Sequence, residues 1–179
     1  PSTAGITQLP GTKIYDTEDL KQRRLSTVIK LGDHGTSEDE ALMYTISGLQ
    51  ASYKFYKNVF HRESIDGKRM ELRASIHFSA GFDNAFWCGD RNHFVFGDGG
   101  HLNNPPPFVC FSNHIINFSL DTIGHEFSHG VIQYTARLGQ EQLRRNDFAA
   151  YSEAITLAEH ISDCFGIMVK HYAEHDNVG

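Results

Sequence analysis

Residues 119–138, Ser-Leu-Asp-Thr-Ile-Gly-His-Glu-Phe-Ser-His-Gly-Val-Ile-Gln-Tyr-Thr-Ala-Arg-Leu, decide the fold of the second half of the chain. Apolar residues recur every three or four positions from Leu120 onward, which predicts an amphipathic helix. His125 and His129 are four residues apart, so they lie one turn apart on the same helix face. Two imidazoles placed in this way can converge on a zinc ion, which binds nitrogen ligands at about 2.0–2.1 Å in a tetrahedral arrangement.

Glu126 adds a carboxylate beside the two histidines. It lies about 100° round the helix from His125, so it can reach a water molecule near a metal without being a ligand itself. This is the general-base position of the HExxH arrangement. The alternative is a helix with two satisfied or exposed histidines. Apolar residues flank both histidines, which favours the metal site.

A catalytic zinc site needs a third protein ligand and an open position. A further helix, which Ser152 could cap, carries Glu159 and Asp163 four residues apart on one face. One carboxylate could bind the metal while the other accepts the second N–H of a ligand histidine. From the residues alone, a solvated acidic face is an equal alternative.

The remaining sequence predicts a helix followed by strands. Residues 37–60 begin with the capping box Ser37-x-x-Glu40 and carry an apolar stripe, which predicts a long helix. Alternating apolar residues predict a strand over 69–79. Shorter strands are expected near 12–15, 94–96 and 108–111, with a surface loop at 103–107.

This order predicts an α+β fold. We expect an N-terminal mixed β-sheet lobe with a long helix, followed by the HExxH helix and a second helix with a metal ligand. The expected segments are an extended N-terminal arm, a β-rich lobe with one long helix, and a pair of zinc-binding helices, over 1–36, 37–116 and 117–179.

Composition bounds the partners of the chain. It has 179 residues and a formal net charge of −6, which argues against nucleic acid or an anionic membrane as the main partner. No apolar run approaches the roughly 18 residues of a membrane span. Three cysteines without a CxxC pair make a disulfide scaffold an unfavourable interpretation.

Several motifs together resemble the thermolysin family of zinc metallopeptidases, in particular its protealysin-type branch. HEFSHG at 125–130 and EHISDCFG at 159–166 match the two zinc-helix motifs of the family. Asn84-Ala85-Phe86-Trp87 is similar to the family's substrate-binding edge strand, and 96–99 to the hairpin that follows it. The resemblance implies a zincin-like, secreted zinc endopeptidase, a hydrolase that cleaves peptide or protein substrates.

The resemblance also implies roles for single residues. His125, His129 and Glu159 would bind zinc, Glu126 would be the general base, and Asp163 would orient a ligand histidine. Asn84 and Ala85 would hold the substrate backbone as an added strand does. Tyr151 is the nearest match to a tyrosine that stabilises the oxyanion.

The sequence departs from the family pattern in three places before its end, and one of them is Ala158, which stands before the ligand glutamate where the family usually carries asparagine. The segment from His129 to Glu159 is longer than usual, so residues 138–150 should form an inserted loop beside the cleft. Lys170 stands where calcium-rich members carry an acid, so a double calcium site is not expected. A single calcium at Asp121 is a weak expectation.

The chain stops at Gly179, where family members continue, so the C-terminal lobe of the family is expected to be absent. Ile161, Phe165 and Met168 would then form an exposed apolar patch that favours self-association or a partner lobe. A non-catalytic zinc-binding module that binds peptides or a partner chain is the alternative function.

Overall fold

The computed structural model describes residues 12–16, 29–30, 40–78, 82–97 and 119–176. Within these ranges the fold is α+β, as predicted. The elements in chain order are β1 (Thr12–Asp16), β2 (Ile29–Lys30), α1 (Glu40–Phe60), β3 (Leu72–Ile76), β4 (Ala85–Cys88), β5 (His93–Phe96), α2 (Leu120–Tyr134), α3 (Gln140–Arg144) and α4 (Phe148–Asp176).

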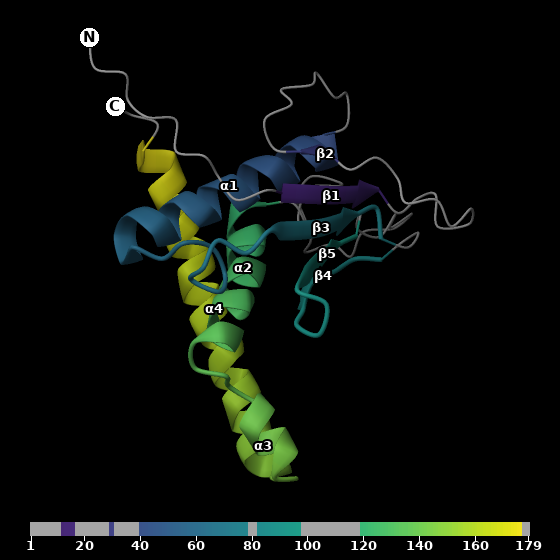
Figure 1. The fold of residues 1–179 in the computed structure, drawn as a ribbon, viewed down its shortest axis with the longest axis vertical. Coiled ribbons are helices and arrows are strands. Elements are labelled where there is room, and N and C mark those ends of the chain that lie inside the picture. Colours follow the sequence, from purple (N-terminus) through teal and green to yellow (C-terminus); the bar gives the residue numbers. More distant parts are fainter. Residues whose placement is uncertain (1–11, 17–28, 31–39, 79–81, 98–118, 177–179) are drawn as a thin grey trace, which may run out of the picture.

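The strands form one mixed sheet in the order β2-β1-β3-β5-β4. β3 is parallel to both β1 and β5, whereas β4 pairs with β5 in the antiparallel direction. β4 therefore lies at an edge, which confirms the predicted edge strand beside the helices (Figure 1). Strands β1 and β2 come from the expected N-terminal arm. The division of the chain into three segments stays a prediction.

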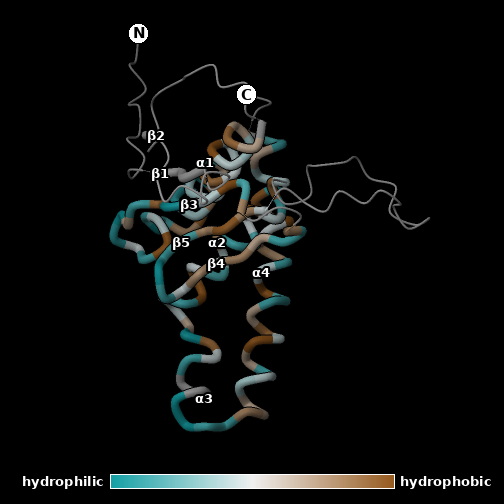
Figure 2. Tube along the Cα trace, turned by 90° about the vertical axis from the view of Figure 1, so that its right-hand side faces the viewer, coloured by the Kyte–Doolittle hydropathy of each residue, from teal (hydrophilic) through white to brown (hydrophobic). Residues whose placement is uncertain are grey.

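An aromatic core joins the helices to the sheet. Phe127 of α2 is fully buried, and its ring stacks on Tyr56 of α1 at 5.4 Å and on Phe94 of β5 at 6.1 Å. Figure 2 shows apolar stretches where α1, β5 and α2 meet, whereas the turn at α3 is hydrophilic. Because Phe127 lies between His125 and His129 in the chain, its burial fixes α2 with the two histidines beside the sheet edge.

Helix α4 begins earlier than the sequence predicted. Asp147 is its N-terminal cap, because Asp147 Oδ1 accepts the N–H of Ala150 at 3.0 Å and its carbonyl accepts the N–H of Tyr151 at 2.9 Å. Ser152 lies inside the helix, where its carbonyl accepts the Thr156 hydroxyl at 2.9 Å. The predicted cap at Ser152 is therefore wrong, and the helix gains an extra turn upstream.

The predicted polar stretch at 138–150 is not a simple loop either. It contains α3, which packs beside the first turns of α4, so the two helices form a hairpin that projects from the body (Figure 1). We call residues 138–155 the α3–α4 hairpin. Among the described residues, no helix is both long enough and apolar enough to cross a membrane.

Of the three residues expected to form an exposed apolar patch, only Met168 is exposed. Phe165 packs against the core, with its ring stacked on Tyr56 at 5.7 Å, and Ile161 is half-buried. Met168 is exposed as predicted, and Leu157 and Ile167 of the same helix are also exposed. The predictions for Ser37, for the loop at 103–107 and for the strand at 108–111 lie outside the described residues.

Candidate metal centre

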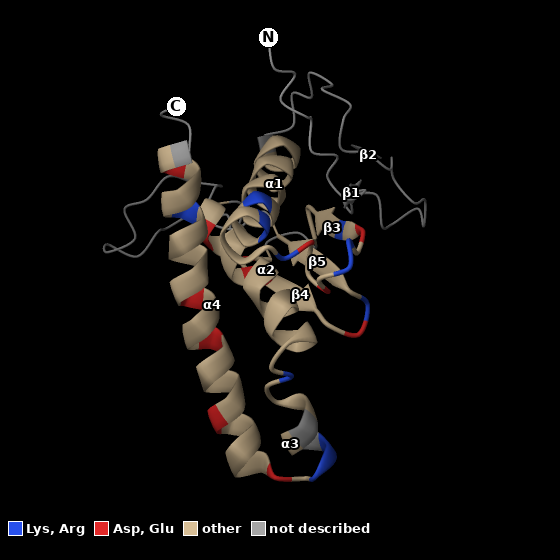
Figure 3. Ribbon diagram, turned by 60° about the vertical axis from the view of Figure 1, so that its left-hand side comes forward, with Lys and Arg blue, Asp and Glu red and all other residues tan. Residues whose placement is uncertain are grey.

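The centre forms where α2 and α4 cross, and two glycines allow their close approach. A Cβ built on Gly166 would lie 2.4 Å from the Asp121 carbonyl oxygen and 3.1 Å from the His125 nitrogen. A Cβ on Gly124 would lie 3.1 Å from the Gly166 Cα. Any larger residue would push the helices apart. The crossing thus places the acidic residues of α4 (Figure 3) against the histidines of α2.

Three predicted ligands meet at this crossing. His125 Nε2 and His129 Nε2 are 2.9 Å apart, and each lies 3.3 Å from Glu159 Oε2. In a tetrahedron with ligand bonds of about 2.0–2.1 Å, ligand atoms are about 3.3 Å apart. The triangle of donor atoms therefore fits one face of a tetrahedral zinc site.

Asp163 holds the first of these ligands. Its Oδ1 lies 2.8 Å from His125 Nδ1, the ring nitrogen that faces away from the triangle. This bond keeps the proton on Nδ1 and leaves the lone pair of Nε2 directed at the other donors. Burial lowers the pKa of His129, which favours the neutral imidazole that binds a metal.

Glu126 is buried beside the triangle but is not part of it. Its carboxylate and the two imidazoles have ligand atoms that all lie within 4.8 Å of one another. Glu126 Oε2 accepts the backbone N–H of Trp87 at 2.8 Å. Burial raises the pKa of Glu126 to about 7. A carboxylate with this pKa can both accept and release a proton near neutral pH.

A cleft of about 590 Å³ opens in front of these groups, within the size range of ligand sites. Asn84, just before β4, and Ala85, its first residue, line the cleft, and their role in holding a substrate stays a prediction. Two N–H groups of this edge are already used, because that of Ala85 donates to Asn84 Oδ1 at 2.9 Å and that of Trp87 to Glu126. Sequence reasoning missed the part played by Trp87, whose Nε1–H also donates to Gln133 Oε1 at 2.6 Å.

Tyr151 lines the same cleft but stands away from the triangle. It precedes Glu159 by eight residues of α4, which is about 12 Å of helix rise. Its role in stabilising an oxyanion stays a prediction. The glycines at the helix crossing were also missed, although a glycine inside a helical pattern is a signal of close packing.

Lys170 lies where the sequence argued against a double calcium site. Its ammonium nitrogen is 3.6 Å from Asp121 Oδ2. A fixed positive charge beside this carboxylate reduces its attraction for a cation. A single calcium at Asp121 stays a prediction.

With this geometry established, comparison with known proteins identifies the family. The family model described as "Thermolysin metallopeptidase, catalytic domain" matches residues 12–133. The chain belongs to the thermolysin metallopeptidase family. Membership implies a zinc cofactor, and the donor triangle fits one. Because Glu159 lies beyond the matched residues, its place in this thermolysin-like site is supported by the geometry.

The chain is also similar to individual thermolysin-like proteins. Protease PrtS of Photorhabdus sp. (strain Az29) is 37% identical over 167 residues, which cover 93% of this chain and 35% of that protein. Thermolysin of Alicyclobacillus acidocaldarius subsp. acidocaldarius is 37% identical over 69% of this chain and 19% of its own length. The precursor of protealysin from Serratia proteamaculans has a similar structure, with a TM-score of 0.72 and 28% identity, over 98% of this chain and 47% of that one. The chain thus spans less than half the length of these relatives.

Proposed function

We propose that this chain carries the zinc site of an endopeptidase that hydrolyses internal bonds of peptide or protein substrates. The observation that supports this most is the donor triangle of His125, His129 and Glu159 beside the buried carboxylate of Glu126. A metal site with a purely structural role would be closed by a fourth protein ligand, whereas this one faces a cleft.

Zinc bound by the triangle supplies Lewis acidity, which lowers the pKa of water towards about 7 and polarises a carbonyl. Glu126 accepts the proton of the attacking water and returns it to the leaving amine. The bond from the Trp87 N–H to Glu126 Oε2 holds the carboxylate and leaves Oε1 for proton transfer. Asp163 keeps His125 in the tautomer that the reaction requires.

The edge strand β4 would bind the substrate backbone. In a strand, the carbonyl of a residue points to the same side as its N–H, so the Ala85 carbonyl faces the open edge. This carbonyl can accept a substrate N–H, while the Asn84 amide, fixed through its Oδ1, can donate from Nδ2. A relative from Pectobacterium carotovorum subsp. carotovorum is named an extracellular metalloprotease, and we propose secretion for this chain on that basis.

The variant Glu126→Gln tests the proposal. We expect the 179-residue chain to bind about one zinc ion in both forms and the variant to cleave a protein substrate at least about 10²-fold more slowly. Zinc content is measured by elemental analysis and cleavage by mass spectrometry of the products. Glu153→Gln, which changes an exposed carboxylate outside the cleft lining, should cleave at the normal rate. Undiminished cleavage by Glu126→Gln would show that this carboxylate is not the base.

A further inference from the structure

The cleft has a second wall that the metal ligands do not explain. Leu138, Tyr151 and Ile155 of the α3–α4 hairpin line it opposite the edge strand. All three lie after Gln133, the last residue that the family model matches. Of these three, Leu138 belongs to the segment 138–150 that the sequence singled out as longer than the family pattern, and Tyr151 and Ile155 follow that segment on α4.

The wall is continuous with the metal centre. Tyr151, Ile155 and Glu159 follow each other at intervals of four residues on α4, so they share one face and are about 6 Å apart along the helix. An extended peptide advances about 3.3 Å per residue. If one peptide bond of a substrate lies at the metal ligands, the substrate side chain that contacts Ile155 is therefore about two residues away from that bond.

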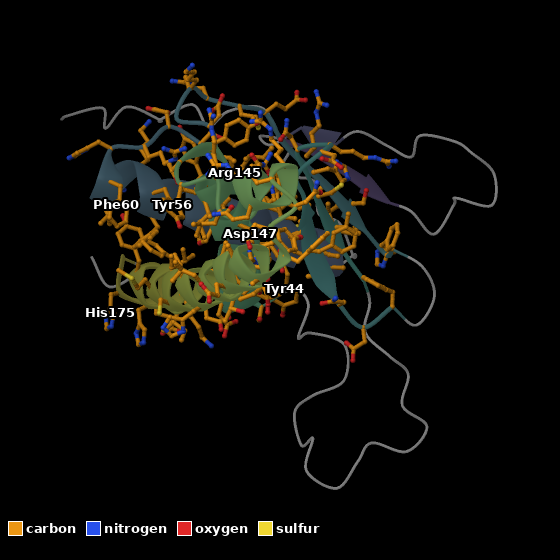
Figure 4. All side chains as sticks on the ribbon, turned by 90° about the horizontal axis from the view of Figure 1, so that it is seen from below. Tyr44, Tyr56, Phe60, Arg145, Asp147 and His175 are labelled. Atoms are coloured by element: carbon orange, nitrogen blue, oxygen red, sulfur yellow. The ribbon has the colours of Figure 1, made fainter. Side chains whose placement is uncertain are left out.

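The wall is also held in place. Gly139, which is buried and has a φ of +85°, brings the backbone against the helix, since a Cβ there would lie 2.8 Å from Ile155 Cδ1 and 3.3 Å from Tyr151 Cε2. The Gly139 N–H donates to Gln142 Oε1 at 3.1 Å, which fixes the turn into α3. Arg145 and Asp147 mark the far turn of the hairpin in Figure 4.

The chemistry of the lining changes from one end of the cleft to the other. Among the lining residues, the ionisable metal-binding groups and Glu126 lie at the α2–α4 crossing. The hairpin end presents the aliphatic Leu138 and Ile155 together with Tyr151 and the uncharged Gln140, and Ile155 keeps 36% of its surface exposed. An apolar side chain of a substrate would bury its own surface and that of the wall, which is favourable. A charged side chain would lose its hydration and find no group of opposite charge among the hairpin residues that line the cleft.

We propose that the α3–α4 hairpin is a specificity subsite for a large aliphatic or aromatic side chain, two residues away from the scissile bond. The subsite rests on the proposed function, because it presumes that a peptide lies along β4 with one bond at the metal ligands. Ile155 and Leu138 determine the preference through contact with that side chain.

Binding can be measured without turnover. The zinc-loaded Glu126→Gln chain is titrated against fluorescein-labelled hexa-alanine peptides in which one alanine at a time is replaced by leucine, and dissociation constants are taken from anisotropy. We expect one peptide position at which leucine binds about tenfold more tightly than alanine. Ile155→Ser should reduce this ratio to about threefold or less.

Leu157→Ser is the matched control, because Leu157 is on the same helix, is 49% exposed and does not line the cleft. It should keep the tenfold ratio. Leu138→Ser, on the other side of the hairpin, should reduce the ratio at the same peptide position. The proposal is overturned if no position prefers leucine, or if the preference is unchanged in both Ile155→Ser and Leu138→Ser. Failure of the proposed function would be separate, because the chain with Glu126 would then bind the preferred peptide and leave it uncleaved.

Discussion

His93 shows how a single buried side chain ties the stability of this chain to pH. Its Nε2 lies 2.7 Å from the Ser75 hydroxyl on the neighbouring strand. Burial, with Arg73 and Arg91 nearby, lowers the pKa of His93 to about 4. In the unfolded chain the imidazole titrates near about 6.5, so between these values the unfolded state binds more protons.

We therefore expect the part of the free energy of unfolding that depends on His93 to be highest above pH 7 and to decrease as the pH falls from about 7 towards 4. At pH 5 His93 should make the free energy of unfolding about 1 kcal/mol lower than at pH 7, after screening by solvent is allowed for. Urea unfolding at pH 7 and pH 5 measures it. His93→Gln should lose less stability between these two pH values than the parent chain, and His175→Gln, an exposed histidine of α4, should lose as much. Equal losses in all three would exclude His93 as the source.

At the scale of residues, the sequence predicted those parts of the site that depend on local spacing. The spacing of His125, Glu126 and His129 predicted a metal site on one helix, whereas Glu159 and Asp163 were assigned through the family resemblance, because their spacing alone fitted a solvated acidic face equally well. The bond from the Trp87 N–H to Glu126 could not be predicted in this way, because it joins residues 39 positions apart. The i, i+4 pattern reveals which side chains share a face but not which backbone group will face them.

At the scale of elements, the start of α4 offers a direct test. Asp147→Ala removes the side chain that accepts the Ala150 N–H, and we expect it to reduce the free energy of unfolding by about 1 kcal/mol. Ser152→Ala should change it by less than about 0.5 kcal/mol, because Ser152 is exposed inside the helix. Urea unfolding monitored by circular dichroism gives both values. If Ser152→Ala lowers the free energy of unfolding more than Asp147→Ala does, the helix starts at Ser152, as the sequence predicted.

The sequence placed this boundary wrongly for a physical reason. Serine and aspartate are both good N-caps, so local chemistry does not choose between Asp147 and Ser152. The choice depends on tertiary packing, and Tyr151, which would lie outside a helix that starts after Ser152, lies inside α4 with its ring against Gly139. The same holds for the sheet: the strands near 12–15, 69–79 and 94–96 were predicted, but their parallel pairing joins segments far apart in sequence.

At the scale of the whole molecule, the proposed metal site would link the two long helices of the second half. His125 and His129 belong to α2 and Glu159 to α4, so a zinc ion bound by all three stabilises the folded chain. With free zinc at about 100 times its dissociation constant, we expect the free energy of unfolding to rise by about 2.7 kcal/mol. Thermal unfolding with zinc and with a chelator measures this difference.

Glu159→Gln should retain less than half of that stabilisation at the same zinc concentration, because it replaces a charged ligand by a neutral one. Glu153→Gln, six residues earlier on α4 and exposed, serves as the control and should retain all of it. Equal stabilisation of the parent chain and Glu159→Gln would show that α4 does not contribute a ligand.

Trp87 gives the cleft an optical property of its own. It is the single tryptophan of the chain, its ring lies 4.7 Å from that of Phe94, and its indole N–H donates to Gln133 within the cleft lining. Light at the long-wavelength edge of aromatic absorption therefore excites Trp87 alone, and Trp87 lies where a peptide would bind. The tryptophan fluorescence of the protein should therefore change when a ligand enters this cleft.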